Sequence, residues 1–340
     1  MTIDKNYILS LAQEILQIPS PSGYTKDIVK RIKQEAKVYN LETETTKKGN
    51  LIITIPGRTN QTLGLSVHVD TLGAMVRSIS SDGTLKFTTI GGPSWPTLDG
   101  EYCTVRTRDE TSYTGTFLST SPAVHVYKDA NTKKRDPENM LVRIDEVVKT
   151  KQDVLDLGIE VGNYVFIDPK TTITDSGFIK SRFLDDKINV ASIFGLIKHL
   201  QAERITPKQT LKIIISVYEE VGHGAAFIPK VDELIAVDMG CIGDDLSCTE
   251  YDVSICAKDS SGPYDYELTT AFAKIAKEQN LNYAVDIYPF YGSDVSAARR
   301  GGNDFKGGLI GPGVHASHGM ERTHYQAIEN TIKLLFHYIK

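Results

Sequence analysis

Three nearly continuous apolar runs constrain the fold of this 340-residue chain more than any other feature. They lie at residues 63–69, 211–218 and 234–237, and each resembles a strand buried in the middle of a sheet. Residues 51–55 also predict a strand. Apolar residues recur at helical spacing at 5–17, in a segment ending at residue 38, and at 187–201, 264–279 and 321–339. Because strands and helices alternate in this way, the sequence predicts an α/β fold.

The character of the sequence changes between residues 71 and 172. Short segments rich in Thr, Val, Tyr and Phe are separated there by turns, with hairpin-like breaks at 81–83 and 108–110. The α/β pattern resumes only afterwards. We therefore predict a small β domain, barrel-like or sandwich-like, at residues 71–172, inserted into an α/β domain formed by residues 1–70 and 173–340.

The three apolar runs end in side chains that can bind a metal ion. His68 and Asp70 close the first run, Glu219 and Glu220 follow the second, and Asp238 follows the third. The carboxyl ends of strands in an open α/β sheet share one edge, so we expect these side chains to converge. A single residue of this kind is more often a core histidine or a helix cap, but three such strand ends favour a common site.

Two further segments supply candidate ligands. Asp185 and Asp186 come just before a predicted helix, where the helix dipole alone would stabilise an acid, and for Asp186 this reading stays open. His315 and His318 lie in a Gly-rich loop before the last predicted helix. A histidine in such a loop has no apolar stripe to join, which makes it a better ligand candidate than one on a helix face.

These residue types predict a site for two metal ions. Divalent ions such as zinc bind carboxylate oxygen and imidazole nitrogen. If one carboxylate is shared, five ligands give each ion three protein donors and leave room for a shared water, which such a pair activates for amide hydrolysis. The candidate ligands are His68, Asp185, Glu220, Asp238 and His318.

Two more acids complete the predicted site. Glu219 adjoins a ligand, so we expect it to act as the general base that takes a proton from the water. Asp70 follows His68 by two residues on the same face of the strand, so we expect it to hydrogen-bond the imidazole.

Composition and charge argue against several other classes of protein. Apolar residues make up 40% and charged residues 24% of the chain, as in ordinary globular proteins. The chain has 43 acidic and 38 basic residues, for a net charge of -5, so nucleic acid is not an expected partner. It shows no signal-peptide pattern and no apolar run of about 20 residues. We therefore expect no membrane partner and a cytoplasmic location.

The ordered motifs resemble those of the M42 aminopeptidases, over nearly the whole chain. They read His-x-Asp at 68, Leu-Asp-Asp-Lys at 184, Glu-Glu-Val-Gly at 219, Val-Asp-Met-Gly at 237, and a final His before Glu321. The resemblance implies a phosphorylase/hydrolase-like metallopeptidase domain, with a central mixed sheet between helices and an inserted β-barrel-like domain. It also implies that residues 262–266 and 292–294 shape the substrate pocket.

By position, the resemblance implies a role for each candidate residue. Asp185 corresponds to the bridging ligand and Glu219 to the base. Glu220 and the C-terminal histidine correspond to ligands of one metal, and His68 and Asp238 to ligands of the other.

The sequence departs from the family pattern in two places. Thr71 stands where many relatives have an acidic residue, which leaves the ligands intact. The last motif reads His315-Ala-Ser-His318 where relatives more often have Tyr-x-His-Ser, so the metal histidine stays open between His315 and His318. The Ser-His-Gly-Met-Glu motif at residues 317–321 resembles one branch of the family, and this resemblance favours His318.

The resemblance implies short peptides as substrates and two divalent ions in each subunit. Zinc is the expected ion, with cobalt and manganese as alternatives. It also implies a homo-oligomer, in which the inserted domain pairs subunits into dimers that build a dodecamer, with a stable dimer as the alternative.

Three other functions have to be set against this one. A metal-dependent deacylase or dipeptidase acting on small N-acyl amino acids would use nearly the same residues. A scaffold that has lost the chemistry would not be expected to retain five ligands and Glu219. A cellulase label is attached to this family, but a glycosidase needs two carboxylates free for acid and nucleophile, and here the paired acids are better used on metal.

Overall fold

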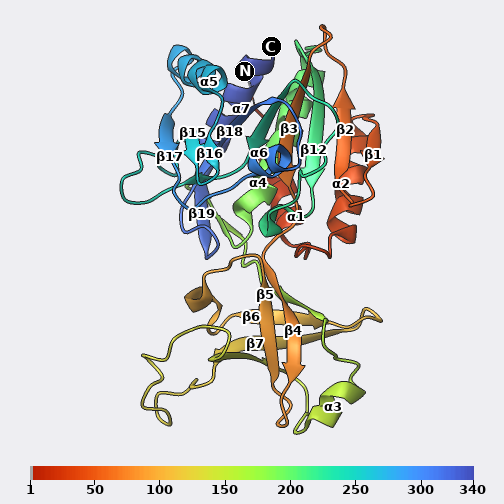
Figure 1. The fold of residues 1–340 in the computed structure, drawn as a ribbon, viewed down its shortest axis with the longest axis vertical. Coiled ribbons are helices and arrows are strands. Elements are labelled where there is room, and N and C mark those ends of the chain that lie inside the picture. Colours follow the sequence, from red (N-terminus) through yellow and green to blue (C-terminus); the bar gives the residue numbers. More distant parts are fainter. Residues whose placement is uncertain (1–2) are drawn as a thin grey trace. The chain divides into compact units, whose positions relative to one another are not determined.

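The computed structural model describes residues 3–340, which divide into two compact units. The first unit comprises the chain up to Thr71 and from Lys170 onward, and the second comprises Leu72–Pro169. The first unit has the α/β arrangement, and the second contains a closed barrel (Figure 1). The predicted fold class, an α/β domain with a barrel-like β insertion, is confirmed.

A ten-stranded mixed sheet crosses the first unit in the order β1-β2-β12-β3-β13-β18-β15-β16, with β14 paired to β18 and β17 to β15. The three apolar runs of the sequence form β12, β3 and β13, which are adjacent, parallel and central. The strands are β1 (Thr43–Thr45), β2 (Leu51–Ile55), β3 (Thr62–His68), β12 (Thr210–Ser216), β13 (Glu233–Val237), β14 (Gly240–Cys241), β15 (Val253–Asp259), β16 (Gly262–Pro263), β17 (Tyr283–Ile287) and β18 (Lys306–Val314).

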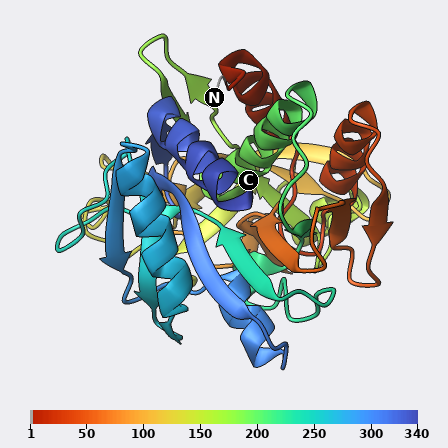
Figure 2. The same ribbon diagram turned by 90° about the horizontal axis from the view of Figure 1, so that it is seen from above.

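Helices cover both faces of this sheet (Figure 2). In β18 the backbone at Gly308 faces Phe272 of α5, whereas Gly307 faces Val295 of α6, so these helices lie on opposite faces. α5 contacts α7, which contacts α4, which contacts α1. The helices of this unit are α1 (Lys5–Leu16), α2 (Lys26–Val38), α4 (Leu184–Ala202), α5 (Tyr266–Glu278), α6 (Asp294–Arg300), α7 (Tyr325–Ile339) and the short 3-10 helix η2 (Glu219–Val221).

α4 is the buried helix of the first unit, because its sequence is apolar on all sides and it lies against both β3 and α1. Gly195 permits the approach of α1, since a Cβ at this position would lie 2.6 Å from Cδ1 of Ile8. The first residues of α4 include Asp185 and Asp186, which are also buried, so two acids enter the interior beside the sheet. No helix among residues 3–340 is long and apolar enough to cross a membrane.

The last predicted helix begins four residues later than expected. Residues 321–324 form the strand β19 (Glu321–His324), and α7 starts at Tyr325, where the His324 side chain accepts a hydrogen bond from the Gln326 N–H. β19 pairs with β11 (Phe178–Ser181), which pairs with β10 (Thr172–Ile173), in a small three-stranded sheet. The prediction was wrong for these four residues because pairing with a distant segment outweighs the local helical spacing.

The second unit is a six-stranded barrel closed in the order β4-β5-β8-β7-β6-β9. The predicted breaks at 81–83 and 108–110 are confirmed, because they join antiparallel neighbours. Phe87 packs against Trp95 and Phe117 in its core. The elements are β4 (Gly73–Ile79), β5 (Leu85–Ile90), η1 (Trp95–Leu98), β6 (Tyr102–Arg106), β7 (Ser112–Ser119), β8 (Met140–Ile144), α3 (Lys151–Asp156) and β9 (Tyr164–Ile167).

Candidate metal centre

The first unit brings all the predicted ligands to one edge of its sheet. β3 ends in His68, β12 runs into η2 with its two glutamates, and β13 is followed by Asp238. These three strands are parallel, so their carboxyl ends lie side by side. Asp185 reaches the same place from the start of α4, and His318 reaches it from the loop between β18 and β19.

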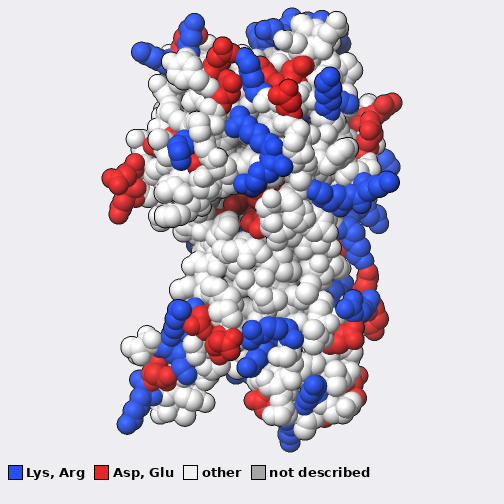
Figure 3. Space-filling model, viewed as in Figure 1, with Lys and Arg blue, Asp and Glu red and all other residues white. Residues whose placement is uncertain are grey.

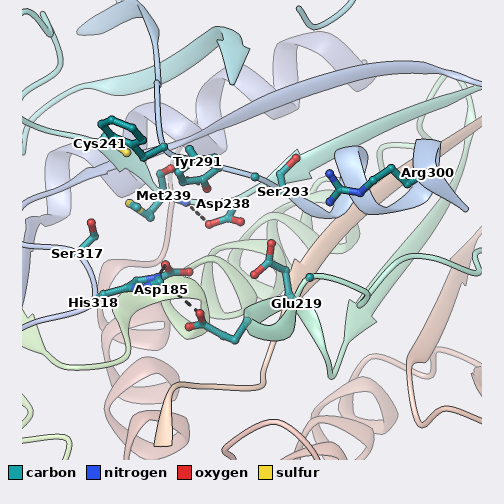
Figure 4. Close-up of a pocket in the computed structure, with 14 residues that line it drawn as sticks. Asp185, Glu219, Asp238, Met239, Cys241, Tyr291, Ser293, Arg300, Ser317 and His318 are labelled. Carbon is teal, nitrogen blue, oxygen red and sulfur yellow. Dashed lines mark hydrogen bonds and ion pairs between the residues drawn. The ribbon is translucent and has the colours of Figure 1, made fainter. Parts of the chain in front are cut away.

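Asp185 lies between two imidazoles. Its Oδ1 is 2.9 Å from Nε2 of His68, and its Oδ2 is 3.6 Å from Nε2 of His318. Oε2 of Glu220 is 3.5 Å from the same nitrogen of His318. Figure 4 shows the side chains of Asp185 and His318 next to each other in the pocket. One carboxylate therefore presents a separate oxygen to each histidine, which is the arrangement that a ligand shared by two ions requires.

The hydrogen bonds of His68 indicate which ring nitrogen is available to a metal. Nδ1 lies 2.9 Å from the backbone carbonyl of Asp70, which can only accept, so Nδ1 carries a proton. Nε2 then faces a carboxylate of Asp185. Two acceptors around one ring are satisfied either by a protonated imidazole or by a cation bound at Nε2. Burial lowers the pKa of His68, but the hydrogen bond to Asp185 and the surrounding acids raise it well above its usual value.

The carboxylate of Asp70 does not make the contact expected from the sequence. Its Oδ1 is 3.7 Å from Nδ1 of His68, whose closer partner is the Asp70 backbone carbonyl. The carboxylate instead accepts the backbone N–H groups of Glu219 and Glu220 at 3.1 and 3.2 Å, and the hydroxyl of Ser22 at 2.5 Å. Asp70 thus holds the turn after β12 against the end of β3.

The side chain of Glu219 lines the pocket. Its Oε2 is 3.8 Å from Nε2 of His68, and its side chain is 14% exposed (Figure 4). Burial and the charges of Asp238 and Asp294 raise the pKa of Glu219 well above its usual value. A carboxylate with a raised pKa at the edge of a pocket is suited to accept a proton.

Asp186 and Asp238 form a second group of possible ligand atoms with His68. Oδ2 of Asp186 accepts the backbone N–H of His68 at 3.0 Å, and its Oδ1 accepts from Asn189 at 2.6 Å. Stabilisation by the helix dipole is therefore only part of the role of Asp186, because one of its carboxylate oxygens also accepts a hydrogen bond from the backbone of β3. Asp238 accepts the backbone N–H of Met239 at 2.6 Å, and burial together with the charge of Asp185 raises its pKa to about 7.

The acids of this site are more numerous than the cations beside them. Burial and the charge of Asp185 raise the pKa of Glu220 to about 8. Burial raises the pKa of Asp185 too, but hydrogen bonds with His318 and His68 outweigh this and lower it below its usual range. Burying several carboxylates beside only two histidines is costly, and divalent cations would offset that cost. The donor set of imidazole and carboxylate fits zinc, cobalt or manganese.

Four acids of the site line a pocket of about 420 Å³, namely Asp185, Glu219, Glu220 and Asp238. Figure 3 shows acidic side chains inside a hollow in the surface of the first unit. Residues 292 and 293 line the pocket, whereas none of residues 262–266 does. Sequence reasoning missed the rest of the wall, because side chains without a motif carry no signal of their own. These lining residues are Gly222, Met239, Cys241, Phe290, Tyr291, Arg300 and Ser317.

Asp294 was also missed as a support of the site. Its Oδ2 accepts the hydroxyls of Ser66 and Ser216 at 2.7 Å each, and its Oδ1 accepts the backbone N–H of Ala225 at 2.9 Å. Ser66 lies two residues before His68 in β3, and Ser216 is the last residue of β12. Asp294 therefore ties together the two strands that carry the histidine and the glutamates.

Known proteins resemble this chain over most of its length. The M42 glutamyl aminopeptidase family matches residues 49–334. "Putative aminopeptidase YhfE" of Bacillus subtilis (strain 168) is 47% identical over 335 residues, covering 98% of this chain and 97% of that protein. The fold matches a TET aminopeptidase from a marine sediment archaeon, Thaumarchaeota archaeon SCGC AB-539-E09, with a TM-score of 0.89, 20% identity, and 98% and 96% of the two chains covered.

A second solved structure has the same fold. The TET1 peptidase of Pyrococcus horikoshii matches with a TM-score of 0.84 and 22% identity, over 98% of this chain and 99% of that one. The family match and the 47% identity to YhfE show that this chain belongs to the M42 family of aminopeptidases, which are hydrolases of peptide bonds.

Proposed function

We propose that this aminopeptidase uses two divalent metal ions to remove N-terminal residues from short peptides. The position of Asp185 carries the proposal, since its two oxygens lie 2.9 Å from His68 and 3.6 Å from His318. His68 and Asp238 would hold one ion, Glu220 and His318 would hold the other, and Asp185 would be shared. Zinc is the proposed ion, with cobalt and manganese as alternatives that fit the same donors.

The ions would supply an activated water and would polarise the carbonyl of the bond to be cut. The remaining chemistry belongs to the chain. Glu219 faces the pocket and is not in the proposed ligand set, so its carboxylate would accept the proton of the attacking water and return it to the leaving amine. Asp70 would keep Glu219 in place through the backbone N–H that it accepts.

A panel of aminoacyl amides tests this function. The protein is stripped of metal with a chelator, reloaded with zinc, cobalt or manganese, and assayed on amides with free and N-acetylated amines. We expect hydrolysis only after reloading and only of the free amines. Hydrolysis restricted to the N-acetylated compounds would identify a deacylase instead, and full activity of the stripped protein would contradict the dependence on metal.

We further propose that the enzyme works as a homo-oligomer in the cytoplasm, with short peptides as its substrates. The TET1 peptidase of Pyrococcus horikoshii, which shares the fold, can assemble into a tetrahedron or a large octahedral shell. A second neighbour, PhTET1-12s, is a dodecamer, and its chain matches with a TM-score of 0.84. The second unit contains none of the proposed ligands, so it is free to serve assembly.

A further inference from the structure

One fully buried acid of the site is neither a proposed ligand nor the proposed base. Glu321 is the first residue of β19, and its side chain has no exposed surface. Its Oε2 accepts the backbone N–H of Asp185 at 3.0 Å, and its Oε1 accepts the backbone N–H of His318 at 3.0 Å. A single carboxylate therefore joins the backbones of two proposed ligands that are 133 residues apart in the sequence.

The carboxyl group of Glu321 suits this pair of bonds. Both donors are backbone N–H groups, so both partners on the side chain must be acceptors, and its two oxygens each accept one bond. A glutamine in the same place would offer one acceptor and one NH₂ group. The NH₂ group would face a second donor, and one of the two bonds would be lost.

The backbone that Glu321 holds needs such support at His318. The φ angle of His318 is 60°, in the left-handed region that residues with a side chain seldom adopt. Conformations of this kind persist where the surrounding structure determines them. The hydrogen bond from His318 to Glu321 is one such constraint.

The small three-stranded sheet places Glu321 between the two segments. In the pairing of β11 with β19, Glu321 lies opposite Ser181, four residues before Asp185. The same strand follows directly on the loop that carries His318. β19 thus delivers its first side chain to the point where the two ligand segments meet.

The geometry points to Glu321 as a positioning residue that sets the spacing of Asp185 and His318 for a metal ion. This inference rests on the proposed function, because it presupposes that both residues are ligands. Glu321 would touch neither the ion nor the substrate. It would act by holding the backbone from which each ligand projects, so its loss should weaken metal binding before it affects the fold.

Asp286 offers a matched control. It is also a buried carboxylate that accepts two backbone N–H groups, those of Ser247 at 2.8 Å and Cys248 at 2.9 Å. It lies in β17, outside the proposed ligand set and the pocket lining. Glu321→Gln and Asp286→Asn therefore make the same chemical change, and we expect each to lower the unfolding temperature of the metal-free protein to a similar degree.

The test is a titration of the metal-stripped full chain with Zn²⁺ in competition with a chromophoric chelator. We expect wild type and Asp286→Asn each to bind two ions, and we expect the affinities of the variant to equal those of wild type. We expect Glu321→Gln to lose about 10- to 100-fold in affinity for at least one ion, the usual effect of removing a group that orients a ligand. Glu321→Asp retains the carboxyl group but is one methylene shorter, so we expect its affinity for Zn²⁺ to lie between those of wild type and Glu321→Gln.

The wild-type titration decides the proposed function, and the variants decide the role of Glu321. A wild type that binds fewer than two ions would refute the dinuclear site and this inference with it. Two ions in wild type with unchanged affinities in Glu321→Gln would overturn the inference alone. Failure of both Glu321 variants to fold, while Asp286→Asn folds, would also overturn it, because Glu321 would then serve the fold rather than the ligands.

Discussion

The carboxylate of Glu219 faces the pocket, and its proposed role is chemical rather than structural. Glu219→Gln fills the same volume and keeps the backbone N–H that Asp70 accepts, but the amide cannot take a proton. We expect kcat to fall by about 100-fold or more, which is the usual contribution of a general base, with metal content unchanged. Turnover of aminoacyl amides and metal analysis of the same sample measure both. Activity within about tenfold of wild type would remove Glu219 from this role.

The two histidines of the last motif should differ sharply when each is changed to alanine. His318 lies 3.5 Å from Glu220 and 3.6 Å from Asp185, whereas the exposed His315 pairs through its backbone with Arg322. We therefore expect His318→Ala to lose one metal ion and the activity. His315→Ala is the matched control and should keep both.

If His315→Ala loses metal and His318→Ala does not, the metal ligand is His315, three residues earlier in the loop. Such a result would also remove the basis for the role of Glu321, since Glu321 accepts the N–H of His318.

At the scale of elements, β18 positions the end of β13 through a glycine. A Cβ at Gly311 would lie 1.7 Å from the backbone carbonyl of Asp238, so no larger residue fits without moving one of the two strands. We expect Gly311→Ala to lower the free energy of unfolding by about 1–3 kcal/mol, the usual cost of overpacking. Because Asp238 is a proposed ligand, we also expect weaker binding of metal.

Gly243→Ala, in the bend that follows β14, is the control for Gly311→Ala. A Cβ at Gly243 would meet no atom within 4 Å, so its effect should stay within about 0.5 kcal/mol. Urea unfolding of the metal-free variants measures the difference. Equal stability of Gly311→Ala and Gly243→Ala would show that β13 and β18 adjust to each other more easily than their close contact implies.

At the scale of the whole molecule, the second unit raises the question of assembly. It comprises Leu72–Pro169 and contains none of the proposed ligands or the base. We expect the protein to elute in size exclusion, and to scatter light, with a mass far above the 37.6 kDa of one chain. Restricting access to flexible chain ends would be one reason for such an assembly in a peptidase.

Replacing the second unit with a short Gly-Ser linker tests its part in the assembly. We expect the shortened chain to lose the large species while the first unit keeps its circular dichroism spectrum and a cooperative unfolding transition. A wild-type protein that is monomeric and fully active at micromolar concentration would contradict the assembly. A shortened chain that still forms the large species would assign the contacts to the first unit.

The sequence by itself determined the features that depend on local pattern. Apolar runs of strand length tend to be buried in a sheet, so the pattern of apolar residues along the sequence locates β3, β12 and β13. Residues that follow parallel strands share an edge of an α/β sheet, so the sequence predicts that His68 and Asp238 lie close together, as they do. The roles of these residues stay predictions until the variants are measured.

The contacts between distant segments were decided only by the tertiary structure. The helical spacing of apolar residues at 321–339 predicts that Glu321 lies in a helix. Pairing with β11 instead makes Glu321 a strand residue, and its carboxyl group joins the backbones of Asp185 and His318. Asp294 carries no motif that points to Ser66 or Ser216, because both serines lie more than 70 residues away in the sequence. A hydrogen bond that closes such a long loop depends on how the sheets and helices pack, and periodicity along the chain holds no information about it.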